Sequence, residues 1–152
     1  MKLMINGAVT LGTMDGANVE IHEAVGDENI FIFGLRDSQV KELQEKGYHP
    51  MEFVEKDEWL RRAVNGMEQG FCGVHFEALA QQIKGGNDPY MVAGDFTDYR
   101  KTAAAAMELY RDQHRWNGMS LVNIAKAGRF AADRSIKDYA NYVWNAKPVK
   151  RW

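Results

Sequence analysis

The sequence predicts an α/β fold that is rich in helices and contains about two parallel strands. Two apolar runs of strand length, 8–13 and 29–34, flank a short helical pattern, and this order is typical of a βαβ unit. After Gly34 the pattern becomes helical and stays so. The chain has 152 residues, 45% of them hydrophobic, which is enough for one globular domain that buries a core.

The N-terminal elements are bounded by glycines and by a capping residue. Gly7 and Gly26 are each suited to end a helix, and Asp15 or Gly16 can begin one. The second strand is apolar at consecutive positions, so we expect a parallel strand that is covered on both faces. In order, the expected elements are a helical turn up to Gly7, a strand over 8–13, a helix over 17–24 and a strand over 29–34.

The remainder of the chain predicts helices separated by glycine, proline and capping residues. Residues 99–113 predict a helix capped by Asp95 or Thr97, because they contain four consecutive alanines and no breaker. Residues 90–93 predict a short extended piece. Five other helices are expected. The first runs from Asp37 or Ser38 to Gly47, the second from Pro50 through Val64, and the third over 74–83. The fourth spans 119–127 with Asn117 as cap, and the fifth spans 135–144 with Asp133 as cap and Pro148 after its end.

Two strands rarely form a stable sheet alone, because their edges must be paired or covered. We therefore expect further strands in sequence upstream of Met1. The apolar start of the chain likewise suggests a piece of a longer protein.

Composition excludes several kinds of partner. The chain carries 19 basic and 21 acidic side chains, and a formal charge of -2 gives no field for nucleic acid or an anionic membrane. No apolar segment is long enough to cross a bilayer. The single cysteine, Cys72, cannot form an internal disulfide, so we expect a cytoplasmic protein with Cys72 as a small buried residue.

The side chains themselves suggest little catalytic chemistry. The four histidines lack any paired spacing, so no metal site is predicted, and no catalytic nucleophile or carboxylate pair stands out. The segment 12–17 follows a strand and opens a helix, where phosphate-binding loops occur, but it lacks both standard glycine spacings. A tight turn is the preferred interpretation there, with an anion cradle as the alternative. Lys2 has apolar neighbours, and desolvation lowers the pKa of an amine and favours Schiff-base chemistry.

Residues 1–20 closely resemble the α-glucan phosphorylases around and after the lysine that binds pyridoxal phosphate. Lys2 falls on that lysine. Ile5 replaces the usual leucine or methionine, which is a near-isosteric change. The family's glutamate-alanine-serine-glycine segment before the lysine is absent, so only the cofactor lysine carries over. The similarity continues at 28–34, 116–119, 123–125, 128–136, 139–140 and Trp144, and it is looser over 48–94.

The resemblance implies a GT-B glycosyltransferase with two Rossmann-like domains. Residues 1–152 would form the C-terminal portion of the second, cofactor-binding domain, with no complete second domain. The implied full enzyme is a PLP-dependent cytoplasmic homodimer that cleaves terminal glucose from an α-1,4-glucan such as glycogen or maltodextrin. Inorganic phosphate would be the second substrate and α-glucose 1-phosphate the product, with the cofactor phosphate taking part in proton transfer. Alone, the chain is expected to be inactive.

Other functions are also compatible with the residues. The chain could be a small intact transferase, although it has no other substrate-binding motif. It could be an anion- or nucleotide-binding module that uses the turn at 12–16. It could also be a helical interaction or scaffold domain without catalysis, whose anchors would be Trp59, Trp116, Trp144 and Trp152.

Overall fold

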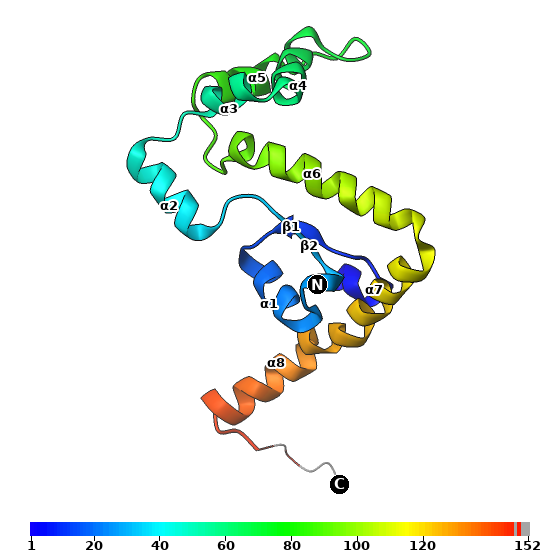
Figure 1. The fold of residues 1–152 in the computed structure, drawn as a ribbon. Helices are drawn as coiled ribbons and strands as arrows, with labels where there is room; N and C mark the ends of the chain where they lie inside the picture. The colour runs from blue at the N-terminus through cyan, green and yellow to red at the C-terminus, as the bar shows by residue number, and fades with distance from the viewer. Residues whose placement is uncertain (148, 150–152) are drawn as a thin grey trace.

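A computed structural model describes residues 1–147 and 149 of the chain. It confirms a helix-rich α/β fold with two parallel strands (Figure 1). Pro148 and Trp152, which the sequence suggested as a helix end and an anchor, lie outside the described residues. The elements are η1 (Lys2–Asn6), β1 (Leu11–Thr13), α1 (Gly16–Val25), η2 (Asp27–Asn29), β2 (Phe31–Phe33), α2 (Asp37–Lys46), α3 (Pro50–Lys56), α4 (Glu58–Gln69), α5 (Glu77–Lys84), α6 (Val92–Arg111), α7 (Gln113–Lys126), η3 (Ala127–Phe130), α8 (Ala132–Asp138) and a π-helical turn, η4 (Tyr139–Val143).

The βαβ unit forms as the sequence predicts. β1 and β2 pair in parallel with Gly12 opposite Ile32, and α1 connects them. Asp15 stands at the N-cap of α1 and Gly26 at its C-cap, as expected. The expectation of a strand covered on both faces is wrong. Both strands are only three residues long and half-buried, and within the described residues each strand pairs only with the other.

A first core lies between the βαβ unit and the C-terminal helices. η1, α1 and α7 meet there, and η3 closes one side of it. Figure 1 shows α1 and α7 beside the sheet, with the N-terminus close to it. The buried residues of this core, here called the sheet core, are Met4, Ile21, Val25, Ile30 and Ala127.

A second core joins α3, α4 and α5 to the start of α6. The expectation of one continuous segment from Pro50 to Val64 is wrong, because Asp57 leaves the helical conformation between α3 and α4. The Asp57 carboxylate instead accepts hydrogen bonds from the backbone N–H groups of Trp59 and Leu60 and begins α4. The buried residues of this second core, here called the helical core, are Val54, Leu60, Val64, Ala80 and Ala93.

Several predicted helix starts are displaced. The expected extended piece at 90–93 is wrong, because α6 already begins at Val92. Asp88 causes this early start, since its carboxylate accepts hydrogen bonds from the N–H groups of Val92 and Ala93 at 2.9 Å each. Asp95 and Thr97 consequently lie inside α6, and α5 begins only at Glu77, after a short bridge between Phe71 and Val74.

The last helices show similar shifts. Asp112, not Asn117, begins α7, and its carboxylate accepts a hydrogen bond from the N–H of Arg115. Asp133 lies within α8, which begins at Ala132, three residues earlier than expected. In both cases the chain enters the helix before the residue that local sequence suggested as its cap.

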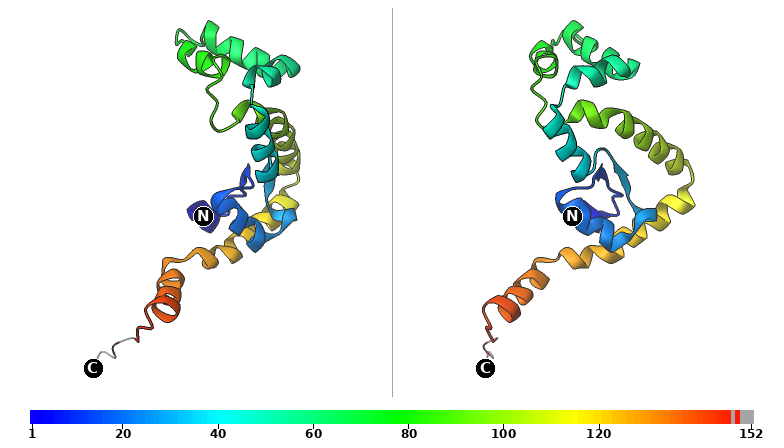
Figure 2. Two further views of the ribbon diagram at one scale, coloured as in Figure 1. Left: turned by 90° about the vertical axis from the view of Figure 1, so that its left-hand side faces the viewer. Right: turned by 60° about the vertical axis from the view of Figure 1, so that its left-hand side comes forward.

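The molecule is elongated. Figure 2 shows α3–α5 at one end and α8 at the other, with the sheet between them. α6 has 20 residues and contacts β2, α3, α4 and α7, so it connects the two cores. No helix in residues 1–147 is both long enough and apolar enough to cross a membrane.

Candidate functional site

Lys2 is the first residue of η1, the short turn before the sheet. The turn is anchored by Met4, which is only 1% exposed in the sheet core, and ends at Gly7 with a left-handed φ of 76°. Gly7 packs so closely on α7 that a Cβ there would lie 2.1 Å from Ser120 Oγ. The turn that carries Lys2 is therefore held in place by Met4 within it and by Gly7 at its end.

The Lys2 side chain itself is exposed, which corrects the expectation of a desolvated amine. Its apolar neighbours Leu3 and Ile5 are 69% and 65% exposed, so they do not shield it within the described chain. Lys2 forms no ion pair with any residue that the structure describes. The amine thus stands free beside an exposed apolar surface, on a turn that is held in place.

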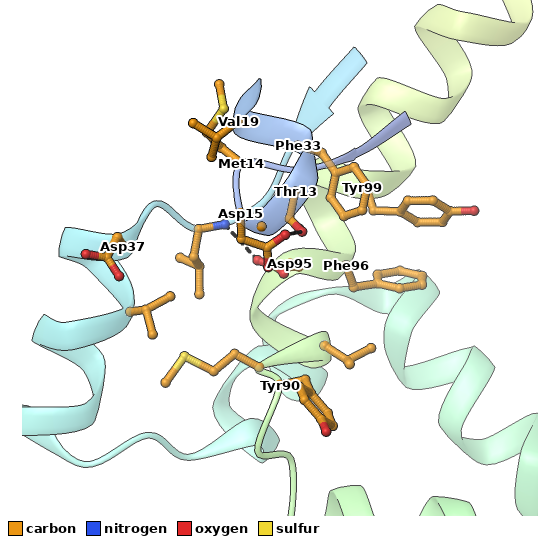
Figure 3. Close-up of a pocket in the computed structure, with 15 residues that line it drawn as sticks. Thr13, Met14, Asp15, Val19, Phe33, Asp37, Tyr90, Asp95, Phe96 and Tyr99 are labelled. Atoms are coloured by element: carbon orange, nitrogen blue, oxygen red, sulfur yellow. Dashed lines mark hydrogen bonds between the residues drawn. The ribbon is translucent and has the colours of Figure 1, made fainter. Parts of the chain in front are cut away.

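A separate cavity lies where β1 and β2 end (Figure 3). It has a volume of about 940 Å³ and does not include Lys2. In open parallel sheets, ligands bind beyond the carboxyl ends of the strands, which is the position of this cavity. Its walls come from the β1–α1 turn, the end of β2, α2 and the beginning of α6. They include Thr13, Met14, Asp15, Phe33, Leu35, Asp37, Tyr90, Asp95, Phe96 and Tyr99.

Asp95 lies at the centre of this cavity in Figure 3, and its Oδ1 accepts a hydrogen bond from the N–H of Leu35 at 2.7 Å. The neighbouring N–H of Gly34 donates to Asp98 at 2.7 Å, so α6 holds the end of β2 through two carboxylates. Burial raises the pKa of Asp95, and the nearby carboxylates of Asp88, Asp98 and Asp15 raise it further. The sequence suggested Asp95 only as a helix cap, because no local signal connects it to Leu35.

The loop at 12–17 functions as a tight turn. A Cβ on Gly12 would lie 2.5 Å from Nδ2 of Asn18, whose amide donates a hydrogen bond to the Thr13 carbonyl. Gly16 has a φ of 46°, in the left-handed region. The Asp15 carboxylate accepts a hydrogen bond from the Thr13 hydroxyl, and its negative charge at the start of α1 opposes an anion there. This geometry favours the turn over the anion cradle.

Cys72 is exposed, so its expected burial is wrong. It lies in the tight turn between Phe71 and Val74 and has a φ of 51°. His22 pairs with Asp27 at the end of α1. In the described part of the chain, no group of three or more histidine, cysteine or acidic residues could hold a metal ion.

The tryptophans occupy three different environments. Trp59 is 54% exposed and has the guanidinium groups of Arg62 and Arg100 over its ring. Trp144 is 60% exposed and stacks on Tyr139. Trp116, near the start of α7, is half-buried. It stacks with Phe31 of β2 at 6.2 Å and meets Tyr110 of α6 edge-on at 5.0 Å.

The sequence of the chain matches one enzyme family along nearly its whole length. The family model for carbohydrate phosphorylases matches residues 1–146, and the chain belongs to this family. Among its relatives, glycogen phosphorylase of Synechocystis is 40% identical over 152 residues, which are 98% of this chain. The liver form of glycogen phosphorylase from Bos taurus is 41% identical over 97% of the chain, and the human muscle form is 38% identical over 99%. The chain spans only 18% of the length of each of these relatives.

Proposed function

We propose that this chain is the C-terminal portion of the second GT-B domain of an α-1,4-glucan phosphorylase. Residues 1–152 would hold pyridoxal phosphate through Lys2. The family match over residues 1–146 supports this proposal most strongly. It favours a phosphorylase over a scaffold domain or an anion-binding module, because neither alternative accounts for similarity along the whole chain.

Lys2 suits the cofactor in chemistry and in position. Its amine is exposed and is not occupied by an ion pair with a described residue, so it can react with an aldehyde. Met4 and Gly7 fix the turn and so restrict the directions in which the amine can point. The exposed side chains of Leu3 and Ile5 offer an apolar surface on which further polypeptide can exclude water from the site.

The proposed division of roles is simple. When bound, pyridoxal phosphate supplies a phosphate group for proton transfer with inorganic phosphate, and the protein orients it. Lys2 holds the cofactor, and η1 with its contacts to α7 keeps the lysine in place. Glucan and phosphate would be bound largely by polypeptide outside this chain, so we expect no phosphorolysis by the chain alone. The full enzyme would be a cytoplasmic homodimer.

A chimera tests the proposal. The C-terminal region of the bovine liver enzyme is replaced by this chain, since the two are 41% identical over 151 residues. The purified chimera should retain roughly one equivalent of pyridoxal phosphate per subunit, and borohydride reduction followed by mass spectrometry should locate the label on Lys2. It should also form glucose 1-phosphate from maltodextrin and phosphate.

Two matched variants make this result specific. Lys2→Arg keeps the positive charge but removes the reactive amine, so the chimera should lose both cofactor and activity. Lys126→Arg, on the exposed side of α7, should change neither. A folded chimera that carries its label on another lysine, or that binds no cofactor, would contradict the role of Lys2.

A further inference from the structure

The cavity at the ends of β1 and β2 combines apolar walls with negative charge. Its lining includes the three carboxylates of Asp15, Asp37 and Asp95, and none of the described lysines, arginines or histidines contributes to it. Most of the remaining lining is aromatic or aliphatic. This combination distinguishes the cavity from an anion site and from a purely apolar groove.

Two of these carboxylates have no ion-pair partner among the described residues. Asp37 is paired with Lys41 at 2.7 Å, but neither Asp15 nor Asp95 forms an ion pair with a described residue. The N–H groups at the start of α6 do not compensate them either. Those of Val92 and Ala93 donate to Asp88. The charge of Asp15 and Asp95 is therefore available to a ligand.

The walls next to these carboxylates are aromatic. Phe33 and Tyr99 meet edge to face with their ring centroids 5.1 Å apart. Phe96 lies one helical turn before Tyr99 on α6. Figure 3 shows Asp15 and Asp95 close together beside Phe33, with Tyr99 and Phe96 on the same side. Cations bind favourably over aromatic faces, and flat apolar groups stack on them. The cavity volume of about 940 Å³ is in the range of small-molecule sites.

From this charge complementarity we propose that the cavity binds a small organic cation, an ammonium or guanidinium group joined to a flat apolar body. The cationic group lies between the carboxylates of Asp15 and Asp95, and the apolar body lies along Phe33, Phe96 and Tyr99. The raised pKa of Asp95 agrees with this assignment, because a bound cation would relieve the repulsion from Asp15, Asp88 and Asp98. The proposal is independent of the cofactor role of Lys2.

Titration of the full chain with 2-phenylethylammonium tests the proposal, with binding followed by calorimetry and by NMR shifts of the Gly34 and Leu35 amides. Its neutral isostere, 2-phenylethanol, should bind at least about tenfold more weakly, because it lacks the charge that the carboxylates recognise. Equal binding of the two compounds would overturn the proposal, as would the absence of saturable binding by the cation.

Substitutions locate the site. Asp15→Asn and Asp95→Asn should each weaken binding of 2-phenylethylammonium by about tenfold, because each removes one charge and keeps the side-chain shape. Asp37→Asn is the matched control, and its effect should be small because Lys41 already pairs with that carboxylate. Phe33→Leu tests the aromatic wall without changing any charge, and it should weaken binding as well. If neither Asp15→Asn nor Asp95→Asn reduces the affinity, the cation binds elsewhere and the proposal is wrong.

Discussion

Two aspartates near the start of α6, Asp88 and Asp95, differ in how well their surroundings stabilise the ionised carboxylate. Asp88 is 7% exposed and accepts three hydrogen bonds, from Tyr48 Oη at 2.8 Å and from the N–H groups of Val92 and Ala93. Three donors thus stabilise its buried carboxylate, as the burial of a polar group requires. Within the described residues Asp95 accepts only the N–H of Leu35 and faces other carboxylates, so its ionised form is less favourable.

This difference predicts a pH dependence for Asp95. The pKa of Asp95 is raised in the folded chain, first by burial and then by Asp88, Asp98 and Asp15. The stability that the protonated form contributes is fully present below the unfolded pKa of about 3.9 and is lost as pH rises through the folded pKa. Asp95→Asn keeps the acceptor for Leu35 and removes the charge. At pH 7 the variant should therefore have the higher free energy of unfolding.

Urea denaturation at pH 7 and at about pH 4 measures this effect, and the difference between variant and parent should shrink at the lower pH. Asp37→Asn is again the control, because that carboxylate is exposed and paired with Lys41. If Asp95→Asn is less stable than the parent by the same amount at pH 7 and at pH 4, the hydrogen bond to Leu35 contributes more to stability than the charge does.

At the scale of elements, the sequence predicted the presence of helices and strands better than their starts. The ends at Gly7, Gly26 and Gly47 were predictable, because a glycine that can adopt positive φ is a local signal. The start of α6 depends on Asp88 and the break between α3 and α4 on Asp57, and both act through side-chain hydrogen bonds. Such bonds compete with several equally good caps nearby in the sequence.

The site was predictable to a similar extent. The cofactor role of Lys2 stays a prediction from a family resemblance that extends beyond any single motif, and the exposure of its side chain did not follow from its apolar neighbours. Asp15 was visible in the sequence only as a candidate helix cap. Its proximity to Asp95 was not, because the contact between Leu35 and Asp95 spans 60 residues and depends on how α6 packs on β2.

The N-cap of α4 gives a prediction at this scale. Asp57 caps α4 and also accepts a hydrogen bond from the Thr97 hydroxyl of α6 at 2.5 Å. Asp57→Ala should lower the free energy of unfolding by about 1 kcal/mol, the usual cost of losing such a cap. Asp57→Asn can still accept the backbone bonds and should cost less. Thermal unfolding followed by circular dichroism distinguishes the two, and equal losses would exclude a capping role.

The pKa of Asp57 is lowered, chiefly by the hydrogen bond from the Thr97 hydroxyl and then by those from the backbone N–H groups of Leu60 and Trp59. Its stabilising contribution is therefore present above the ordinary aspartate pKa and is lost as pH falls. The difference between Asp57→Ala and the parent should consequently be larger at pH 7 than at pH 3. This is opposite in sign to the behaviour expected of Asp95.

At the scale of the whole molecule, stability is divided between two small cores. The sheet core and the helical core have no buried residue in common, and α6 connects them. Among the largest of the almost fully buried side chains are Met4 in the sheet core, 1% exposed, and Val64 in the helical core, 0% exposed. Neither core is large, so each can open locally without the other.

Truncation of these two residues tests the division. Met4→Ala should destabilise the sheet core by about 2–5 kcal/mol, and Val64→Ala should destabilise the helical core by a smaller amount, because fewer atoms are removed. Hydrogen exchange followed by mass spectrometry should show that Met4→Ala reduces amide protection mainly in α1 and α7. Val64→Ala should reduce it mainly in α3–α5. Equal loss throughout the chain in either variant would indicate a single cooperative unit.

The contact of Trp116 with rings from β2 and α6 has a practical consequence for optical work. Its indole is half-buried at the junction of α6 and α7, whereas those of Trp59 and Trp144 already face water. Among the described tryptophans, Trp116 thus has the most shielding to lose when that junction separates. A red shift of the intrinsic fluorescence while the far-ultraviolet dichroism still reports intact helices would reveal that separation, without any attached dye.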